Sequence, residues 1–244
     1  VLYLDIIMRK NFLIILIICG FSYSSKSQSN TINLGNYDDN RIHYGFLLGL
    51  HSSYYRMYYS NNFIDSNYSN LHSIIPSSKP GFKLGFISDF NLIYPFDFRT
   101  LLQVAFYEFN MDYLYVDGTI FSDTRTATLL EFPLLIKYKS KRRGNHRMYM
   151  LGGLKPSLEI GAKNKDEAGK DILNLKSFDL SLEIGFGSDI FFQLFKLSPE
   201  IRYSRGLINL LKNNPDNFNE YNLPIDKLFV HNISVFFTFE GGPK

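Results

Sequence analysis

Large apolar side chains alternate with polar or small ones along several stretches of this 244-residue chain. The alternation is clearest in Phe178–Gly187, where Phe, Leu and Ile take every second position and Asp, Ser, Glu and Gly lie between them. Residues 195–207 and 232–239 repeat the pattern. A period of two residues predicts β-strands with one apolar and one polar face. The polar faces carry charges, so the strands either bury the apolar face in a soluble sandwich or turn it onto lipid in a membrane barrel.

Five more stretches with this pattern precede these three, which gives eight predicted strands. They occupy residues 42–51, 82–92, 98–107, 130–139 and 148–160. The connections run long, short, medium, short, medium, short and long, and polar residues 60–78 and 209–226 form the two long ones. Outer-membrane barrels alternate short periplasmic turns with longer external loops in this way, whereas a soluble sandwich has no reason to do so. The sequence therefore predicts an all-β fold, an eight-stranded antiparallel transmembrane β-barrel of the outer membrane over residues 41–240.

Prolines and turn formers refine this outline. Pro133 and Pro156 lie inside predicted strands, and because proline removes a ladder donor, each predicts a bulge or a local break. Tyr94-Pro95 predicts a tight turn before the third strand, and Asp117-Gly118 predicts a loop of moderate length before the fourth. Residues 190–193 predict the short turn before the seventh strand.

The composition agrees with a barrel that carries aromatic girdles. Aromatic residues make up 16% of the chain, and charged residues make up 20%, which is below the usual quarter. The formal net charge of +3 is too weak to indicate a nucleic-acid-binding protein. The expected surroundings are therefore outer-membrane lipid, with no nucleic acid.

The first 27 residues are predicted to consist of upstream residues, 1–7, and a cleaved signal peptide that starts at Met8. Met8-Arg9-Lys10 gives a basic start, Phe12–Gly20 is an apolar core too short to span a membrane, and small residues precede Gln28. The alternatives are a membrane anchor or a buried helix. Residues 28–40 are polar and rich in turn formers, so we expect a periplasmic lead-in there. Cys19, the one cysteine, lies inside the predicted signal, so the mature chain is expected to have no disulfide and no thiol chemistry.

The inward faces of the predicted strands carry charges of nearly balanced sign. The cations are Lys83, Arg99, Lys137, Lys155, Lys196 and Arg202, and the acids are Asp89, Glu131, Glu159, Asp179, Glu183, Asp189 and Glu200. An eight-stranded barrel is only wide enough to be filled by its own side chains, and buried charges need partners. We therefore expect a lumen charge network that braces the barrel from inside. The alternative interpretation is a gated conduit.

Enzymatic motifs are absent from the sequence. It contains no G-x-S-x-G, H-E-x-x-H, Walker or G-x-G-x-x-G motif, and its histidines lack metal-ligand spacing. His51 with Ser52 or Ser53 is the one candidate for a lipid-modifying site. Asp216 and Glu220 could hold calcium, although a solvated loop is the simpler interpretation. We therefore expect no catalytic residue, no cofactor and no metal site, and hence no enzyme.

Residues 139–147 form the densest basic cluster of the predicted mature chain. The alternation of loop lengths places this turn at the periplasmic end of the predicted barrel. Its candidates for docking an acidic partner are Lys141, Arg142, Arg143 and Arg147. The alternative is a solvated turn whose cations lie near lipid phosphates.

Short motifs follow one another over nearly the whole predicted mature chain. They are Asn36-Tyr37-Asp38, His43-Tyr44-Gly45-Phe46, Leu48-Gly49-Leu50, Pro80-Gly81-Phe82-Lys83-Leu84-Gly85, Glu131-Phe132-Pro133-Leu134-Leu135-Ile136-Lys137-Tyr138-Lys139-Ser140-Lys141-Arg142, Gly152-Gly153 and Leu197-Ser198-Pro199-Glu200-Ile201-Arg202-Tyr203-Ser204. As an ordered set they resemble the PorT family of the Bacteroidetes type IX secretion system. The resemblance implies a small, non-catalytic outer-membrane barrel that supports export of cargo proteins and, in gliding species, of surface adhesins, with other secretion subunits as partners. A lipid-modifying barrel enzyme and a stand-alone structural or adhesive barrel are the alternatives.

Overall fold

The computed structural model describes residues 31–64, 70–164, 173, 175–212 and 224–241. The chain divides into residues 1–31 and 32–244, and the fold described below belongs to the second unit. The predicted upstream residues and signal peptide over residues 1–27 and the calcium candidates Asp216 and Glu220 lie outside the described residues. In the described part of the chain, no helix is long and apolar enough to cross a membrane.

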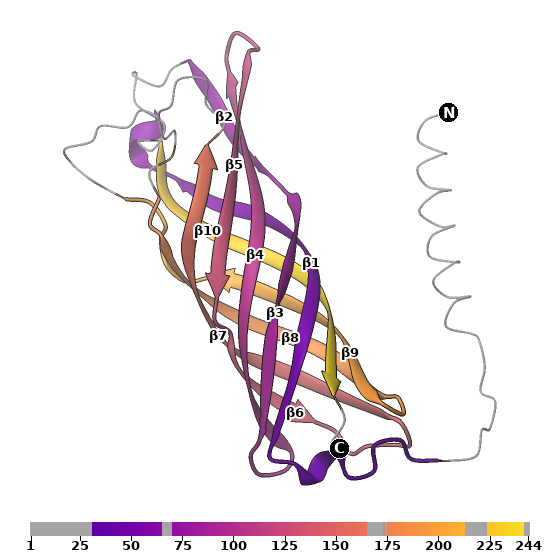
Figure 1. The fold of residues 1–244 in the computed structure, drawn as a ribbon. Coiled ribbons are helices and arrows are strands. Elements are labelled where there is room, and N and C mark those ends of the chain that lie inside the picture. Colours follow the sequence, from indigo (N-terminus) through magenta and orange to yellow (C-terminus); the bar gives the residue numbers. More distant parts are fainter. Residues whose placement is uncertain (1–30, 65–69, 165–172, 174, 213–223, 242–244) are drawn as a thin grey trace, which may run out of the picture. The chain divides into compact units, whose positions relative to one another are not determined.

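The second unit is a closed ring of antiparallel strands with two short 3-10 helices, η1 (Tyr37–Asp39) and η2 (Asn61–Ile64). The strands are β1 (Ile42–Tyr59), β2 (Leu71–Ser77), β3 (Lys79–Asn91), β4 (Phe96–Tyr115), β5 (Ile120–Glu131), β6 (Leu134–Lys139), β7 (His146–Asn164), β8 (Phe178–Phe191), β9 (Phe195–Gly206) and β10 (Ile225–Gly241). β1 pairs with β3 on one side and with β10 on the other, which closes the ring (Figure 1). The other neighbours follow chain order.

The ten segments make eight wall strands, because two wall strands are interrupted. β2 and β3 both pair with β4, and only Ser78 separates them. β5 and β6 both pair with β4 and with β7, and Phe132 and Pro133 separate them. The predicted eight-stranded antiparallel barrel is therefore confirmed.

Both prolines of the predicted strands meet at the gap between β5 and β6. Pro133 lies in that gap, and the Phe132 N–H donates to the Pro156 carbonyl oxygen at 2.9 Å. A paired strand residue directs its N–H and C=O to the same neighbour, so the missing donor of Pro156 also faces the gap. β7 itself continues past Pro156 without a break. One interruption of the ladder, opposite Lys155 and Pro156, therefore accommodates both prolines.

Burial alternates along the wall strands with the predicted parity. Phe86 and Leu50 are 70% and 68% exposed, although both side chains are large and apolar. On the same two strands, Lys83 and His51 are only 2% and 4% exposed. A soluble sandwich would bury the apolar face instead, so this parity is that of a barrel whose outer face lies in lipid.

β4 shows where the lipid-facing belt ends. In its first half the inward residues include the polar Asp97, Arg99 and Gln103, and outward residues such as Phe106 are apolar. In its second half Met111 and Tyr113 are buried on the inward side, and Asp112 lies on the outward side. The polarity of the two faces inverts because water replaces lipid around this part of the wall.

The inversion explains why several predicted strand limits are wrong. Polar residues 60–78 include β2, and the loop predicted after Asp117-Gly118 is a turn of residues 116–119 that leads directly into β5. At the other end of the wall, where the faces do not invert, β8 extends to Phe191, so the connection lies at residues 192–194 and not at the predicted 190–193. The strands were predicted from apolar residues on their outward face. Wall segments whose outward face lies in water do not show this pattern, so they were not predicted as strands.

The turns 92–95, 140–145 and 192–194 lie together at one end of the barrel, here called the short-turn end (Figure 1). The start of the second unit and the end of β10 lie there too, because the Tyr37 hydroxyl contacts the Glu240 carboxylate at 2.5 Å. The longer connections 60–70, 165–177 and 207–224 join strands at the opposite end, the long-loop end.

Cysteine substitution tests the lipid-facing parity of β8. Leu182→Cys and Ile184→Cys should react with a lipid-soluble thiol reagent and resist a membrane-impermeant one, because both exposed side chains face acyl chains. Lys227→Cys, at a solvent-exposed position of the long-loop end, is the control and should react with both reagents. Labelling of positions 182 and 184 by the impermeant reagent in intact membranes would contradict the membrane barrel.

Candidate functional site

Arg99 of β4 is the cationic centre of the lumen near the short-turn end. Its guanidinium donates two hydrogen bonds of 2.6 Å to the Asp89 carboxylate on the neighbouring strand β3. It also reaches across the lumen to Glu200 of β9 and, at 3.5 Å, to Glu240 of β10. Arg99 is completely buried. Its contacts with Glu200 and Glu240 link β4 to strands that are not its neighbours in the ring.

Asp189 of β8 is the matching anionic centre. Its carboxylate lies 3.2 Å from the Lys137 ammonium, 3.1 Å from the Arg147 guanidinium and 3.7 Å from the Lys196 ammonium. Lys196 in turn lies 2.8 Å from Glu240, which is also a partner of Arg99. Cations and anions therefore alternate through this layer, which is the arrangement that offsets the cost of burying them.

A second group of charges surrounds Glu131 of β5, farther toward the long-loop end. The Glu131 carboxylate lies 3.1 Å from the Lys83 ammonium and 3.0 Å from the Lys155 ammonium. The Tyr107 hydroxyl donates to it at 2.6 Å, and the Gln103 amide donates to it as well. Four donors from β3, β4 and β7 thus satisfy one buried carboxylate.

An apolar layer lies between the two groups of charges. It consists of Leu47, Ile87, Leu101, Leu135, Tyr149, Leu151 and Phe236. Along β3, for example, Ile87 separates Lys83 from Asp89 on the inward face. Arg202 also helps to fill the lumen, since its guanidinium binds Glu183 at 3.0 Å and also binds Glu200. The described side chains therefore fill the lumen at this level.

The structure brings nearly all the predicted lumen charges together. Of the thirteen, twelve are at most 6% exposed, and the exception is Glu159, which is half-buried and pairs with Arg125 at 2.6 Å. Three acidic or basic residues that were not predicted also pair inside the barrel: Arg125, Glu240 and Asp97, which lies 2.7 Å from Lys139. Each of these continues the inward parity of a predicted strand beyond its predicted end, and that parity is the signal that finds them.

Asp179 of β8 is less completely paired than the other lumen acids. Its Oδ2 accepts a hydrogen bond from Ser181 at 3.1 Å, while its Oδ1 has no hydrogen-bond partner among the described residues. The side chain lines a cavity of about 30 Å³ together with Lys155 and Arg125. A cavity of this size can hold one water molecule, which would supply the missing hydrogen bond.

The residues predicted as a periplasmic lead-in close the short-turn end of the lumen. Tyr37 is 1% exposed, and its ring stacks on His43 with the centroids 3.9 Å apart. Its hydroxyl donates to Glu240, and the adjacent Asp38 pairs with Arg147 at 2.7 Å. The segment is therefore part of the lumen network, which its polar composition alone does not indicate.

The four cations predicted to dock a partner separate into two pairs. Arg147 is 4% exposed and belongs to the lumen, where it binds Asp189 and Asp38. Arg142 is half-buried, with its guanidinium 3.7 Å from the Phe191 ring centroid and donating to the Leu34 carbonyl oxygen at 3.1 Å. Strand parity turns Arg147 inward and packing holds Arg142 against Phe191, so neither arginine belongs to the predicted docking surface. Lys141 and Arg143 are exposed.

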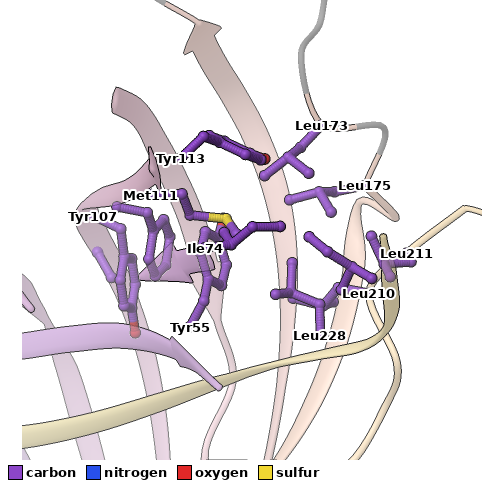
Figure 2. Packing of buried hydrophobic residues seen from close by; sticks show 13 residues of the cluster. Tyr55, Ile74, Tyr107, Met111, Tyr113, Leu173, Leu175, Leu210, Leu211 and Leu228 are labelled. Carbon is purple, nitrogen blue, oxygen red and sulfur yellow. The ribbon is translucent and has the colours of Figure 1, made fainter. Parts of the chain in front are cut away.

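An apolar cluster fills the long-loop end of the barrel (Figure 2). Its buried members are Tyr55, Ile74, Ala105, Tyr107, Phe109, Met111, Tyr113, Leu173, Leu175, Leu210, Leu211, Ile225 and Leu228. Leu175 and Leu211 are joined by an isolated β-bridge, so residues from two connections fold over the lumen. The outer wall stands in water at this level, and the interior is accordingly packed like a soluble protein core.

The candidate lipid-modifying residues do not form a catalytic arrangement. The His51 Nε2 contacts the Phe106 carbonyl oxygen at 3.1 Å, and the Nδ1 contacts the Asn232 amide at 2.9 Å, so both ring nitrogens are engaged. Ser52 lies on the opposite face of β1 and contacts Ser78 at 2.5 Å, while Ser53 is buried. Within the described residues, no group of three His, Cys, Asp or Glu side chains could hold a metal ion.

The sequence of the chain also matches a known protein family. A protein family described as outer membrane protein beta-barrel domain matches residues 25–212. The chain belongs to this family. The barrel is therefore an outer-membrane protein whose apolar belt contacts lipid, and its short turns face the periplasm, as is general for such barrels.

Solved barrels of similar fold have low sequence identity to the chain. OprG of Pseudomonas aeruginosa is 14% identical over 82% of this chain and 93% of its own, with a TM-score of 0.46. Neisserial surface protein A is 14% identical over 79% and 95%, with a TM-score of 0.38. The attachment invasion locus protein Ail of Yersinia pestis is 12% identical over 82% and 99%, also with a TM-score of 0.38. No curated protein sequence matches the chain.

Replacing Glu131 by Gln tests how strongly the lumen charges stabilise the barrel. The variant leaves Lys83 and Lys155 buried without their shared carboxylate, so the free energy of unfolding should fall by about 3–5 kcal/mol. Urea titration followed by heat-modifiable gel migration measures it. Glu108→Gln breaks a partly exposed pair with Lys79 and should cost less than about 1 kcal/mol. Equal stability of the two variants would mean that water screens the lumen charges.

Replacing Tyr37 by Phe tests the closure at the periplasmic end. Loss of the hydrogen bond to Glu240 should lower the free energy of unfolding by about 1.5–3 kcal/mol at neutral pH. Burial and the neighbouring Glu240 carboxylate raise the pKa of Tyr37 in the folded state. The unfolded phenol ionises near pH 10, so this contribution is complete below about pH 10 and diminishes above it.

Wild type and Tyr37→Phe should therefore become more similar in stability as the pH rises above about 10. Tyr44→Phe is the matched control, because Tyr44 lies on the outer face at the same end and is 66% exposed. If Tyr37→Phe were as stable as Tyr44→Phe at neutral pH, the hydrogen bond would not contribute to closure.

Proposed function

We propose that this barrel is a non-catalytic component of a type IX protein secretion system that supports the export of cargo proteins. The observation that carries the proposal is the filled lumen. Ion pairs around Arg99, Asp189 and Glu131 occupy it, Tyr37 closes the periplasmic end, and an apolar cluster fills the other end. A barrel packed in this way offers its outer surface and its fixed shape to other subunits, and the cargo passes elsewhere.

The resemblance to the PorT family supports the same proposal through particular residues. The motif Pro80–Gly85 contributes Lys83, the motif 131–142 contributes Glu131 and Lys137, and the motif 197–204 contributes Glu200 and Arg202. All five of these charged residues lie in the buried ion pairs of the lumen. The resemblance therefore concerns the residues that hold the barrel in shape, which is what an accessory barrel would retain.

A lipid-modifying enzyme is less well supported. Such an enzyme needs a histidine base beside a serine nucleophile at the outer rim. His51 engages both ring nitrogens with Phe106 and Asn232, and Ser52 points to the other face of the strand. The inward Ser53 is buried under the same wall, where a lipid substrate has no access. We therefore propose that the barrel is not an enzyme.

Deletion of the gene in the organism that encodes the protein tests the proposal. Cargo proteins should disappear from the culture medium and accumulate in the periplasm, while the masses of lipid A and phospholipids stay unchanged. Quantitative mass spectrometry of medium, periplasm and lipid extract measures all three. Normal secretion with altered lipid masses would replace the proposed function by the enzymatic alternative.

Two controls separate a specific secretion defect from general damage to the outer membrane. Other outer-membrane barrels should keep their normal abundance in the deletion strain, and Tyr44→Phe should restore secretion as well as the wild type does. A tagged barrel isolated in mild detergent should also bring secretion subunits with it. Absence of any such subunit together with normal secretion would favour a stand-alone structural or adhesive barrel.

A further inference from the structure

A groove of about 580 Å³ lies on the outer surface of the wall at the periplasmic end. Its lining comes from the β3–β4 turn, from the last residues of β6, and from the β6–β7 turn and the start of β7. These residues are Tyr94, Pro95, Tyr138, Lys139, Ser140, Lys141, Arg143, His146, Arg147 and Met148. Tyr138 and Met148 are 51% and 45% exposed, and they continue the outward parity of the belt residues Ile136 and Met150. The groove is therefore continuous with the lipid-facing surface.

The exposed charges of this groove are all of one sign. Lys141 and Arg143 are exposed and form no ion pair within the described part of the chain, and no acidic residue lines the groove. At the long-loop end, Lys79 and Lys227 each lie 3.8 Å from an acidic side chain, whereas Arg56 and Arg205 are exposed and form no ion pair among the described residues. The groove thus presents uncompensated positive charge directly beside an apolar surface.

The surrounding aromatic residues place the groove at the level of the membrane interface. Tyr94 is 56% exposed and Tyr138 is 51% exposed, and tyrosines on the outer face of a barrel mark the level of the lipid head groups. The turn that carries Lys141 and Arg143 spans only residues 140–145, so it cannot carry these cations far from the bilayer. A molecule that meets them must itself lie at the head-group level, which favours a lipid over a periplasmic protein.

We propose that this groove binds one inner-leaflet phospholipid through its phosphate. The Lys141 ammonium and the Arg143 guanidinium bind the phosphate oxygens, a pairing that is strong because both partners are charged. The glycerol and the first methylenes of an acyl chain pack against Tyr138 and Met148. Lipids with a net negative charge, such as phosphatidylglycerol, bind more tightly than zwitterionic lipids. The ammonium group of a zwitterionic head group would find no acidic side chain in the lining of the groove. This inference does not depend on the proposed role in secretion.

Native mass spectrometry of the delipidated full-length barrel in mild detergent tests the site. Titration with phosphatidylglycerol should show one saturable lipid per wild-type barrel, and phosphatidylcholine should bind more weakly. The double variant Lys141→Gln/Arg143→Gln should bind phosphatidylglycerol roughly 10- to 30-fold more weakly, since two interfacial cations are lost. Both side chains are exposed, so the variant should fold normally, and heat-modifiable migration checks this.

The double variant Arg56→Gln/Arg205→Gln is the matched control. It removes the same charge from exposed positions at the opposite end of the wall and should bind phosphatidylglycerol like the wild type. Equal loss in both double variants, or no saturable binding by the wild type, would overturn the proposal. Displacement of the lipid by glycerol 3-phosphate at equal concentration would instead assign the site to a soluble phosphate. Loss of a co-purifying protein with unchanged lipid binding would assign Lys141 and Arg143 to a protein interface.

Discussion

The charges buried inside the wall are the constraint on which the rest of this barrel depends. A buried ion that loses its partner costs several kcal/mol, so each lumen charge has to meet an opposite charge from another strand. Arg99 shows the consequence, because its partners Asp89 and Glu200 lie on strands that are far apart around the ring. A shift of one residue in any strand register would turn such charges onto lipid. The ion pairs therefore select one register and one circumference for the barrel.

The two ends of the barrel are closed by different chemistry because their surroundings differ. At the periplasmic end the wall is still within the lipid belt, and the closure uses the same polar partners as the lumen, with Tyr37 bound to Glu240. At the long-loop end the wall stands in water, and an apolar cluster around Met111 and Leu228 replaces the ion pairs. A barrel that is closed at both ends and filled between them keeps a fixed outer shape. That property suits a subunit that other proteins or lipids recognise from outside.

The basic turn between β6 and β7 shows how tertiary structure divides one run of charge. Arg147 faces inward and joins the lumen ion pairs, while Arg142 lies against Phe191 and the lead-in backbone. Lys141 and Arg143 are left on the surface beside two exposed tyrosines. Any recognition by this turn therefore depends on Lys141 and Arg143. The groove beside them places these two cations next to the apolar, lipid-facing surface of the wall.

The sequence by itself determined the wall of this protein. Alternation with a period of two depends only on strand geometry, so it predicted the number of wall strands, their antiparallel order and the inward position of residues such as Lys83 and Glu131. It did not predict where the strands end, because the polarity of the two faces inverts where the wall leaves the lipid, as Met111 and Asp112 show. Nor did it predict the pairing of charges. Arg99 and Glu200 are 101 residues apart in the chain, and only closure of the ring brings them into contact. The same is true of Tyr37, since a tyrosine in a polar segment becomes buried only when a closed lumen provides His43 and Glu240 as its neighbours.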